Sequence, residues 1–408
     1  MKNYYILKTL CKRIFLVGSG NFWYERGEIG DDSSIYYRAL TSILFFAYCF
    51  MTLLEIMAAF MGDFPEDETR DSITFSVSHT ILMIKFFSVI LNKKNIKKLT
   101  YDLVRVCEYY EKGSLMKEKY KIMKINVTAY FVTVYGSAAC FVFEGLRKVY
   151  DGSHFVTIVT YYPSYSDDSV LATFIRILTT IILFVMMLSM IITVDGFTMV
   201  NLIIFKYKFI TLRHYFEELR EDVKSICKMG NPEISAEKLT NGLIEGIRMH
   251  KELLRLSKEI DKVFGTVMAC QLCQSSGSAV SLLLHIALSE DLTLLASLKI
   301  IFFVAALFFL LGLFLCNAGE ITYQASLLSD SIYYCGWHIC PTNLPRGRHL
   351  RKLVSIACCQ AQRPLVMKAF KMIELTYATF LMVRWMDGWM FVAVSRKNDL
   401  TDFDETLQ

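Results

Sequence analysis

Charged residues are scarce in this chain. Asp, Glu, Lys and Arg make up 20% of its 408 residues, whereas hydrophobic residues make up 54%, and the mean hydropathy is positive. A typical soluble domain carries about 25% charged residues and about 45–50% apolar ones. The composition therefore disfavours an ordinary soluble domain and favours a membrane protein.

Patterns that indicate several other protein classes are also missing. Lys8, Lys12 and Arg13 interrupt the only apolar core near the N-terminus, so we expect no signal peptide and a cytosolic N-terminus. No nucleic-acid-binding motif accompanies the net charge of +5, so we predict no nucleic-acid partner. The sequence has no internal repeat, which disfavours a transporter built from inverted halves. The Asp-Arg-Tyr and Asn-Pro-x-x-Tyr motifs of G-protein-coupled receptors are absent as well.

The sequence also lacks a clear metal or catalytic site. Cys270-x-x-Cys273 and Cys335-x-x-His338-x-Cys340 have acceptable metal-ligand spacing, but neither is followed by a second ligand pair. We therefore predict no metal site, no cofactor and no enzyme activity. Charged residues within apolar stretches are scattered rather than gathered as catalytic groups: Glu55, Lys85, Arg176, Asp195 and Lys299.

Apolar residues gather in seven stretches long enough to cross a bilayer, which requires about 20 residues each. The fourth stretch is longer than necessary, so we expect it to tilt or to project into water. The fifth is the weakest, because Gln271 and Gln274 dilute it. The stretches lie at residues 38–61, 72–92, 123–146, 169–204, 265–288, 292–319 and 369–394.

The basic residues predict the orientation of these stretches. Cytoplasmic loops carry an excess of Lys and Arg, and here about 31 lie in alternate connections and about five in the others. We therefore predict an all-α membrane protein with seven transmembrane helices, a cytosolic N-terminus and an extracellular C-terminus. The basic connections are 1–37, 93–122, 205–264 and 320–366; the others are 62–71, 147–168, 289–291 and 395–408.

The two long connections at 205–264 and 320–366 show helical periodicity. In the first, a Gly-Asn-Pro break at 230–232 separates two helices, and the second helix has no stop signal before residue 265. The apolar stripes of these helices need a partner surface. We predict a helical intracellular layer beneath the membrane that anchors the copies of the chain to one another.

Several motifs resemble the insect odorant receptor family. "DSIYYCGW" followed by "LRKLVSIACCQAQRPLVMKAFKMIELTYATF" is similar to the C-terminal signature of that family. "TVDGFTMVNLIIFKYKFITLRHYFEEL" resembles its fourth span, with Asp195 at the acidic position, and "HKELLRLSKEIDKVF" and "QLCQSS" resemble the entry into its fifth span. The resemblance covers most of residues 190–394.

The last span departs from the family pattern. The usual Ser-Tyr-Ser-Tyr-Phe run is replaced by residues 387–391, of which only Phe391 is shared. Gustatory receptors carry Thr-Tyr, five residues and Gln-Phe, whereas Thr376-Tyr377 is followed here by Val383-Arg384, and a gustatory receptor channel subunit stays an alternative. The chain lacks the long insertion of the family's coreceptor before the fifth span, so it resembles a ligand-tuned subunit.

The resemblance implies an odorant-gated, poorly selective channel for monovalent and divalent cations. Such channels are tetramers that include the coreceptor, in the plasma membrane of sensory neuron dendrites. The odorant binds between spans two, three, four and six, and the last span lines the pore. The resulting organisation has a ligand-binding bundle with the N-terminal segment (1–204), intracellular helices (205–264), spans five and six (265–319), an anchor segment (320–366) and the pore helix with a short tail (367–408).

Two charges lie within the last span. If Phe391 is aligned with the family, the constriction falls near Ala393 and Arg384 points about 180° away, because a helix turns about 100° per residue. Asp387 lies about 60° from Arg384 by the same geometry. We favour an Arg384–Asp387 ion pair inside the bundle over pore lining. The resemblance then implies a pore face of Met386, Trp389, Ala393 and Arg396.

The ligand site implied by the resemblance combines apolar side chains with a few polar groups, as small-molecule pockets do. His79 is the most informative candidate, because a neutral imidazole there can hydrogen-bond an alcohol, an ester or a carbonyl; a bond to a neighbouring helix is the alternative. Ordinary helix packing is the alternative for every other candidate. The candidates are Val77, His79, Thr80, Met83, Tyr135, Ser137, Phe141, Thr179, Thr180, Phe184, Ser297, Ile300 and Phe303.

Overall fold

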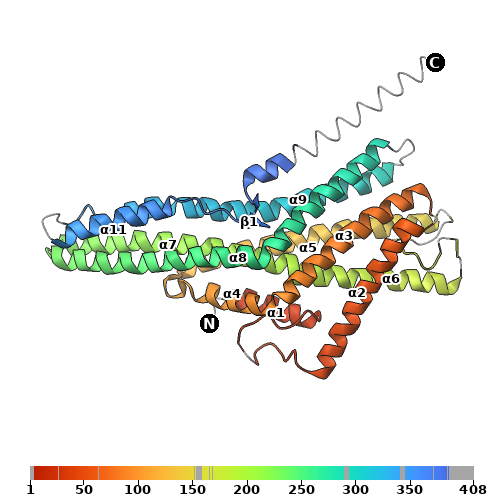
Figure 1. Ribbon diagram of the computed structural model, residues 1–408, viewed down its shortest axis with the longest axis horizontal. Helices are drawn as coiled ribbons and strands as arrows, with labels where there is room; N and C mark the ends of the chain where they lie inside the picture. The colour runs from red at the N-terminus through yellow and green to blue at the C-terminus, as the bar shows by residue number, and fades with distance from the viewer. Residues whose placement is uncertain are drawn as a thin grey trace, which may run out of the picture.

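The computed structural model is almost entirely helical (Figure 1). It describes residues 4–25, 27–62, 64–150, 152, 159–164, 166–167, 169–288, 294–340, 345–370, 372–383 and 385, without the side chains of 66, 67, 70, 71, 283–288, 294–299 and 345–348. The first helices are α1 (Tyr5–Leu16), α2 (Ile35–Met61), α3 (Glu66–Leu91), α4 (Lys93–Arg105) and α5 (Gly113–Tyr150), with a short 3₁₀ turn at Glu108–Tyr110. The later helices are α6 (Val170–Met190), α7 (Phe197–Lys228), α8 (Pro232–Leu288), α9 (Leu294–Ser326), α10 (Leu328–Tyr333) and α11 (Pro345–Ala361).

Five helical runs in the described part of the chain are long and apolar enough to cross a membrane. They are α2, the Ser72–Leu91 part of α3, α5, the continuous Val170–Lys228 run and Ile300–Tyr333. They correspond to predicted spans one to four and six. The fifth predicted span is the C-terminal part of α8, where polar residues reduce the hydropathy, and the seventh begins in the helical residues 377–383.

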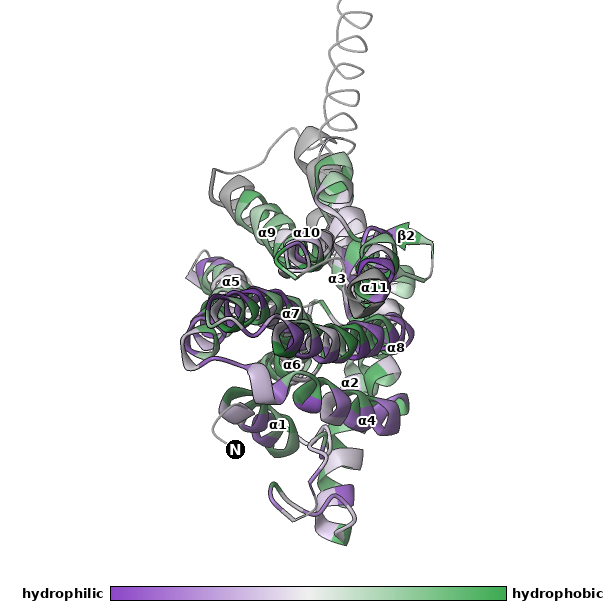
Figure 2. Cartoon of the chain, turned by 90° about the vertical axis from the view of Figure 1, so that its left-hand side faces the viewer, coloured by the Kyte–Doolittle hydropathy of each residue, from purple (hydrophilic) through white to green (hydrophobic). Residues whose placement is uncertain are grey.

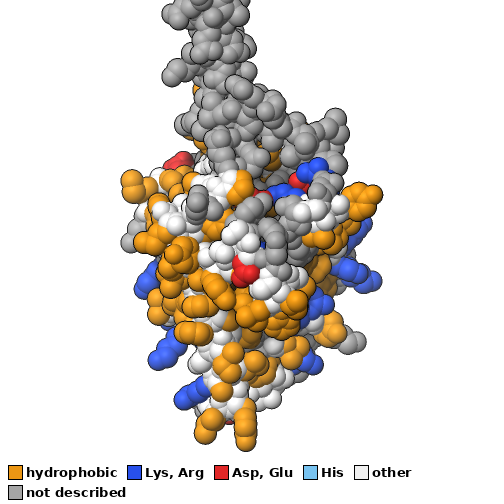
Figure 3. All heavy atoms as spheres, turned by 90° about the vertical axis from the view of Figure 1, so that its right-hand side faces the viewer, with side chains coloured by type: hydrophobic (Ala, Val, Ile, Leu, Met, Phe, Trp, Pro, Cys, Tyr) orange, Lys and Arg blue, Asp and Glu red, His pale blue; other side chains and the backbone are white. Residues whose placement is uncertain are grey.

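The outer surfaces of these helices are apolar. On α2, Ile43, Phe46, Phe50 and Leu53 recur at helical spacing, and each is more than half exposed. An aqueous surface rarely carries so large a continuous apolar patch. Figure 3 likewise shows hydrophobic side chains over most of the coloured face at one end of the molecule, with Lys and Arg near its margins. These faces are suited to contact with lipid.

A second helical layer extends beyond the apolar segments. α7, α8 and α9 continue past them and pack with α10 and α11 at the opposite end of the molecule (Figure 1). Figure 2, viewed from that end, shows many hydrophilic residues on α4, α7 and α8. The predicted break is confirmed, since α7 ends at Lys228, Gly230 has a φ of +80° and Pro232 begins α8. α8 then continues for 57 residues without interruption, as predicted.

The start of the last span differs from the prediction, which placed it at residue 369. A two-stranded antiparallel hairpin, β1 (Lys368–Ala369) and β2 (Ile373–Glu374), comes first, and the helix begins only at residue 377. The Lys368 backbone N–H donates to Asp261 of α8 at 3.2 Å, which docks the hairpin against that helix. Hydropathy averaged over a long window does not detect so short a reversal of the chain.

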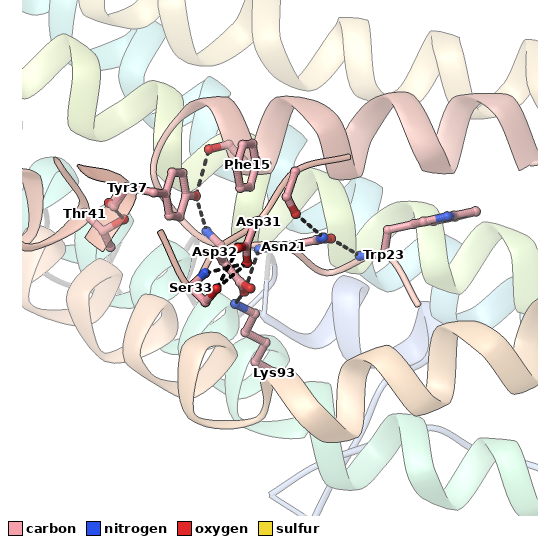
Figure 4. A network of polar contacts seen from close by, with 11 residues as sticks. Phe15, Asn21, Trp23, Asp31, Asp32, Ser33, Tyr37, Thr41 and Lys93 are labelled. Atoms are coloured by element: carbon pink, nitrogen blue, oxygen red, sulfur yellow. Dashed lines mark hydrogen bonds and ion pairs between the residues drawn. The ribbon is translucent and has the colours of Figure 1, made fainter. Parts of the chain in front are cut away.

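A polar network fixes the loop between α1 and α2 (Figure 4). The Tyr37 hydroxyl donates to the Phe15 carbonyl at 2.8 Å and accepts from Gly20 N–H at 2.8 Å. Asp32 accepts from Lys93 at the start of α4 and from Asn21 N–H at 3.4 Å. Burial raises the pKa of Asp32, but the Lys93 ammonium, the Asn21 N–H and the charge of Lys97 together lower the pKa below its ordinary value. The loop is thereby tied to α2 and α4.

A buried charge cluster joins Tyr4, just before α1, and Glu111, just before α5, to Lys119 of α5 and Lys208 of α7. The Lys208 ammonium contacts Glu111 Oε1 at 2.7 Å and donates to the Tyr4 hydroxyl at 2.7 Å, and Lys119 contacts Glu111 Oε2 at 2.9 Å. The three charged side chains are at most 3% exposed. Burial raises the pKa of Glu111, and the two ammonium groups more than reverse this effect, so that the pKa lies below its ordinary value. The Glu111 carboxylate therefore contacts both buried cations, and the three groups carry a net charge of +1.

Replacing Glu111 with Gln is expected to destabilise the protein strongly, because Lys208 and Lys119 lose their counter-charge. Removing one partner from a buried ion pair costs about 3–5 kcal/mol of unfolding free energy. Thermal unfolding of the detergent-solubilised protein measures the effect as a fall in the midpoint. Glu218→Gln is the matched control, since the Lys112–Glu218 pair is about half exposed and such pairs contribute about 0–1 kcal/mol. Equal midpoints for the two variants would contradict the role of the cluster.

Candidate ligand-binding site

A cavity of about 110 Å³ lies among α3, α5, α6 and α9, and two glutamines of α8 reach it. Its lining is mainly apolar, with a few polar side chains. Such a combination is typical of small-molecule sites. The lining residues are Phe75, Ser78, His79, Leu82, Tyr130, Val134, Ser137, Ala138, Phe141, Val142, Leu183, Phe184, Met187, Met190, Ile191, Asp195, Gln271, Gln274, Phe303, Ala306, Leu307 and Leu310.

Helical periodicity brings these side chains to one face of each helix. On α5, Tyr130, Val134, Ser137 and Phe141 follow one another at intervals of three or four residues. The same spacing relates the four lining residues of α3. Residues three and four apart share a helix face. One orientation of each helix about its axis therefore directs all of its lining residues toward the cavity.

Three phenylalanines form an aromatic wall. The ring centroids of Phe75 and Phe141 lie 5.0 Å apart, those of Phe141 and Phe303 lie 5.4 Å apart, and both pairs have edge-to-face geometry. The His79 ring stacks on Phe75 with centroids 5.7 Å apart. Such aromatic pairs contribute about 0.5–1.5 kcal/mol beyond their burial. The wall joins α3, α5 and α9.

A polar network adjoins the apolar part of the cavity. The Lys85 ammonium donates to the side-chain oxygens of Gln271 and Gln274, the second at 2.7 Å, and lies 3.7 Å from Asp195 Oδ1. The Tyr130 hydroxyl donates to Asp195 Oδ2. Charges at bilayer depth are costly unless they are paired within the bundle. The network joins α3, α5, α8 and the π-helical segment Ile191–Gly196.

The π-helical segment sets the position of Asp195 between α6 and α7. A Cβ atom at Gly196 would lie 2.8 Å from the Ile191 carbonyl oxygen, closer than real side chains approach, so the segment requires glycine there. Segments of this kind occur mostly as single turns and often at functional sites. The wider turn presents Asp195 to both Tyr130 and Lys85.

A second charged pair lies between α2 and α3. Glu55 Oε2 and His79 Nδ1 are 2.6 Å apart, and both side chains are almost fully buried. His79 lines the cavity, whereas Glu55 lies behind it. Glu55 Oε1 and the Ser137 hydroxyl have no hydrogen-bond partner among the described residues.

Five of the thirteen predicted ligand residues line the cavity: His79, Ser137, Phe141, Phe184 and Phe303. Val77 lies two residues from His79, about 200° around the helix, and is 53% exposed. Thr80 is about 100° away from His79, and Met83 is buried in the main core. The sequence analysis therefore named the helices that surround the cavity but not the rotation of each.

The other candidates have different roles. Tyr135 donates from its hydroxyl to the Phe184 carbonyl at 3.2 Å, and Thr179 and Thr180 donate to carbonyls one turn earlier. Ile300 packs in a separate apolar cluster with Ala279 and Leu282. The side chain of Ser297 lies outside the described part of the structure.

The sequence analysis missed the contribution of α8. It treated Gln271 and Gln274 only as polar residues that weaken the fifth span, although their spacing of three residues on one helix face indicates a shared partner. That partner is Lys85, a charged residue of another span. The intramembrane charges are scattered along the sequence, and the fold brings two of them, Lys85 and Asp195, together.

The structure does not describe the residues predicted to line the pore or to form the intramembrane ion pair. Arg384, Met386, Asp387, Trp389, Ala393 and Arg396 lie outside the described residues. Within the described residues, no three metal-ligating side chains gather at one point and all twelve cysteines are free. In the Cys270-x-x-Cys273 motif, the first thiol is buried and the second exposed, so the two do not form a common site.

Comparison with known proteins gives the family. The model of the family described as 7tm Odorant receptor matches residues 67–385. This chain belongs to the odorant receptor family. The match decides between the odorant and gustatory alternatives in favour of the first. No curated protein matches the chain.

Solved structures of insect olfactory receptors have the same fold. The chain matches olfactory receptor OR5 of Machilis hrabei in complex with eugenol with a TM-score of 0.78 and 14% identity, over 97% of this chain and 99% of that one. A second structure of the same receptor, whose description names no ligand, gives a TM-score of 0.78 and 14% identity, over 96% of this chain and 99% of that one. The seven-helix fold of an odorant receptor is thus confirmed.

The Lys85–Asp195 pair provides a test of the charge balance in this odorant receptor. Lys85→Met and Asp195→Asn are each expected to lower the unfolding free energy by about 3–5 kcal/mol, because each leaves one charge unpaired in the bundle. The double variant is expected to lose less than the sum of the two, since no unpaired charge remains. Thermal unfolding in detergent and surface labelling measure these effects. Additive losses would show that the two charges do not compensate each other.

Proposed function

We propose that this odorant receptor is the ligand-tuned subunit of an odorant-gated cation channel. A small volatile ligand binds in the cavity among α3, α5, α6 and α9, and binding opens a pore for monovalent and divalent cations. The channel is a heterotetramer with the odorant coreceptor in the plasma membrane, in the dendrite of a sensory neuron. The main support is an apolar cavity between membrane-spanning helices, with few polar groups.

The cavity is connected to the elements that would carry the response. Asp195 joins it to the helix that continues into α7, and Gln271 and Gln274 join it to α8. α8 also holds the hairpin that precedes the last helix, through Asp261 and Lys368. A change in the cavity therefore has a continuous packed route to the last helix, through elements without a break.

The proposed pore face is Met386, Trp389, Ala393 and Arg396, with the Arg384–Asp387 pair turned into the bundle. This part of the proposal rests on the resemblance to the family, aligned at Phe391, on helix geometry and on the predicted orientation, with the N-terminus in the cytosol. Four arginines in a ring would oppose cation flow, because like charges repel strongly in a narrow passage of low dielectric constant. A channel with fewer copies of this chain avoids that repulsion.

Expression of the chain with and without an insect odorant coreceptor tests the heteromer. Voltage-clamp recording over a chemically diverse odorant panel is expected to show evoked current only when both subunits are present. The coreceptor alone is the control. Robust odorant-evoked cation current from this chain alone would contradict the heteromer and the inhibitory effect of the Arg396 ring.

Filling the cavity tests the ligand site. Val134→Trp places a large ring in the lining of α5 and is expected to reduce odorant sensitivity at least tenfold, because the ligand and the indole compete for the same volume. Val132→Trp is the matched control, since Val132 lies on the same helix and is 60% exposed on the outer face. Dose–response curves measured with the coreceptor compare the two. Unchanged sensitivity in Val134→Trp would place the ligand elsewhere.

A further inference from the structure

We infer that the Glu55–His79 pair makes the cavity selective for ligands that accept hydrogen bonds, such as ketones, esters and ethers, over ligands that only donate them. The inference rests on the proposed ligand site and adds the chemical class of the ligand. It follows from which atoms of the buried polar side chains carry a proton, and from which of these atoms have no hydrogen-bond partner in the protein.

His79 presents one nitrogen to the cavity. Its Nδ1 is engaged 2.6 Å from Glu55 Oε2. Nε2 has no hydrogen-bond partner among the described residues, although the ring lines the cavity. The ring is held in place from its other side by stacking on Phe75. Nε2 is therefore the atom of His79 that a ligand can reach.

Charge balance decides whether Nε2 donates or accepts. Glu55 and His79 are buried at 0% and 6% side-chain exposure, and the Lys85 ammonium is already balanced by Asp195. An ionised Glu55 beside a neutral imidazole would leave a net negative charge in a medium of low dielectric constant, which is very costly. The pair is neutral when it holds two protons, one between Nδ1 and Oε2 and one on Nε2. A proton on Glu55 Oε1 instead would be a buried donor without a partner among the described residues, so Nε2 carries the second proton and is a donor.

The other polar groups of the lining also leave donors free. The Lys85 ammonium donates to the side-chain oxygen of Gln274. The amide N–H group of Gln274 has no partner among the described residues and is available as a donor. Asp195 accepts from Tyr130 and faces Lys85. Ser137 adds a hydroxyl without a described partner. The lining thus offers three donors, and its free acceptors are Asp195 Oδ1, which lies 3.7 Å from the Lys85 ammonium, and the Ser137 hydroxyl oxygen.

This pattern defines the ligand class. A compact apolar body fits the wall of Phe75, Phe141 and Phe303, and one acceptor oxygen satisfies a donor of the lining. A donor-only ligand leaves the Nε2–H donor of His79 unpaired, and an unpaired buried donor lowers the affinity. A carboxylate or an ammonium group would add an uncompensated charge to the bundle.

Three probes of similar size test the preference. Acetophenone has an acceptor only, cumene replaces the carbonyl oxygen with a methyl group, and indole has an N–H donor only. Voltage clamp of the chain with its coreceptor is expected to show acetophenone at least tenfold more potent than cumene and indole. Equal potencies, or a preference for indole, would overturn the inference. Silence toward these probes and a broad odorant panel would instead overturn the proposed function.

Two variants assign the preference to the pair. The Glu55→Leu, His79→Phe double variant removes both polar groups without leaving a buried charge, and the acetophenone-to-cumene ratio is expected to fall at least tenfold. Val77→Phe, on the same helix but outside the lining, is the control that keeps the ratio. In Glu55→Gln a neutral imidazole satisfies charge balance and Nε2 can accept, so the acetophenone-to-indole ratio is expected to fall. A merely structural role would lower all three responses together and leave both ratios unchanged, which would overturn the inference.

Discussion

Compensation of buried charge is the constraint on which the arrangement of this receptor depends. Helices that cross a bilayer cannot leave a charge facing hydrocarbon, so each charged side chain needs a partner on another helix. Asp195 and Lys85 join the fourth and second spans, and Glu55 and His79 join the first and second. The cluster around Glu111 applies the same rule in the second helical layer. The pairs therefore fix which faces of the helices meet.

The cavity is a consequence of these pairings. Lys85 contacts the two glutamines of α8 and Asp195. The apolar faces of α3, α5, α6 and α9 surround the space beside this network. The π-helical turn before Gly196 allows Asp195 to reach that point without a break between α6 and α7. The polar groups beside the cavity thus contribute to both stability and recognition. The hydrogen bonds and ion pairs that they form with one another stabilise the bundle, and the atoms that these bonds leave unpaired are available to a ligand.

Much of the fold follows from local sequence properties. Apolar stretches gave the membrane helices to within a few residues at α2 and α3, and the Gly-Asn-Pro break between α7 and α8 was visible in three residues. The motifs near residues 330–380 indicated the family. The helices that surround the cavity were also predictable, but only five of thirteen candidates line it, because periodicity gives the width of an apolar face and not its rotation in the bundle.

The sequence by itself determined the class of protein, the spans and the family, because length, hydropathy and short motifs are properties of continuous segments. Only the tertiary structure decided that Lys85 faces Asp195, that His79 contacts Glu55 and lines the cavity, and that a hairpin precedes the last helix. These features depend on the rotation and crossing of helices distant in the chain. Burial then fixes their chemistry, since only opposite charges brought together in the bundle are stable there.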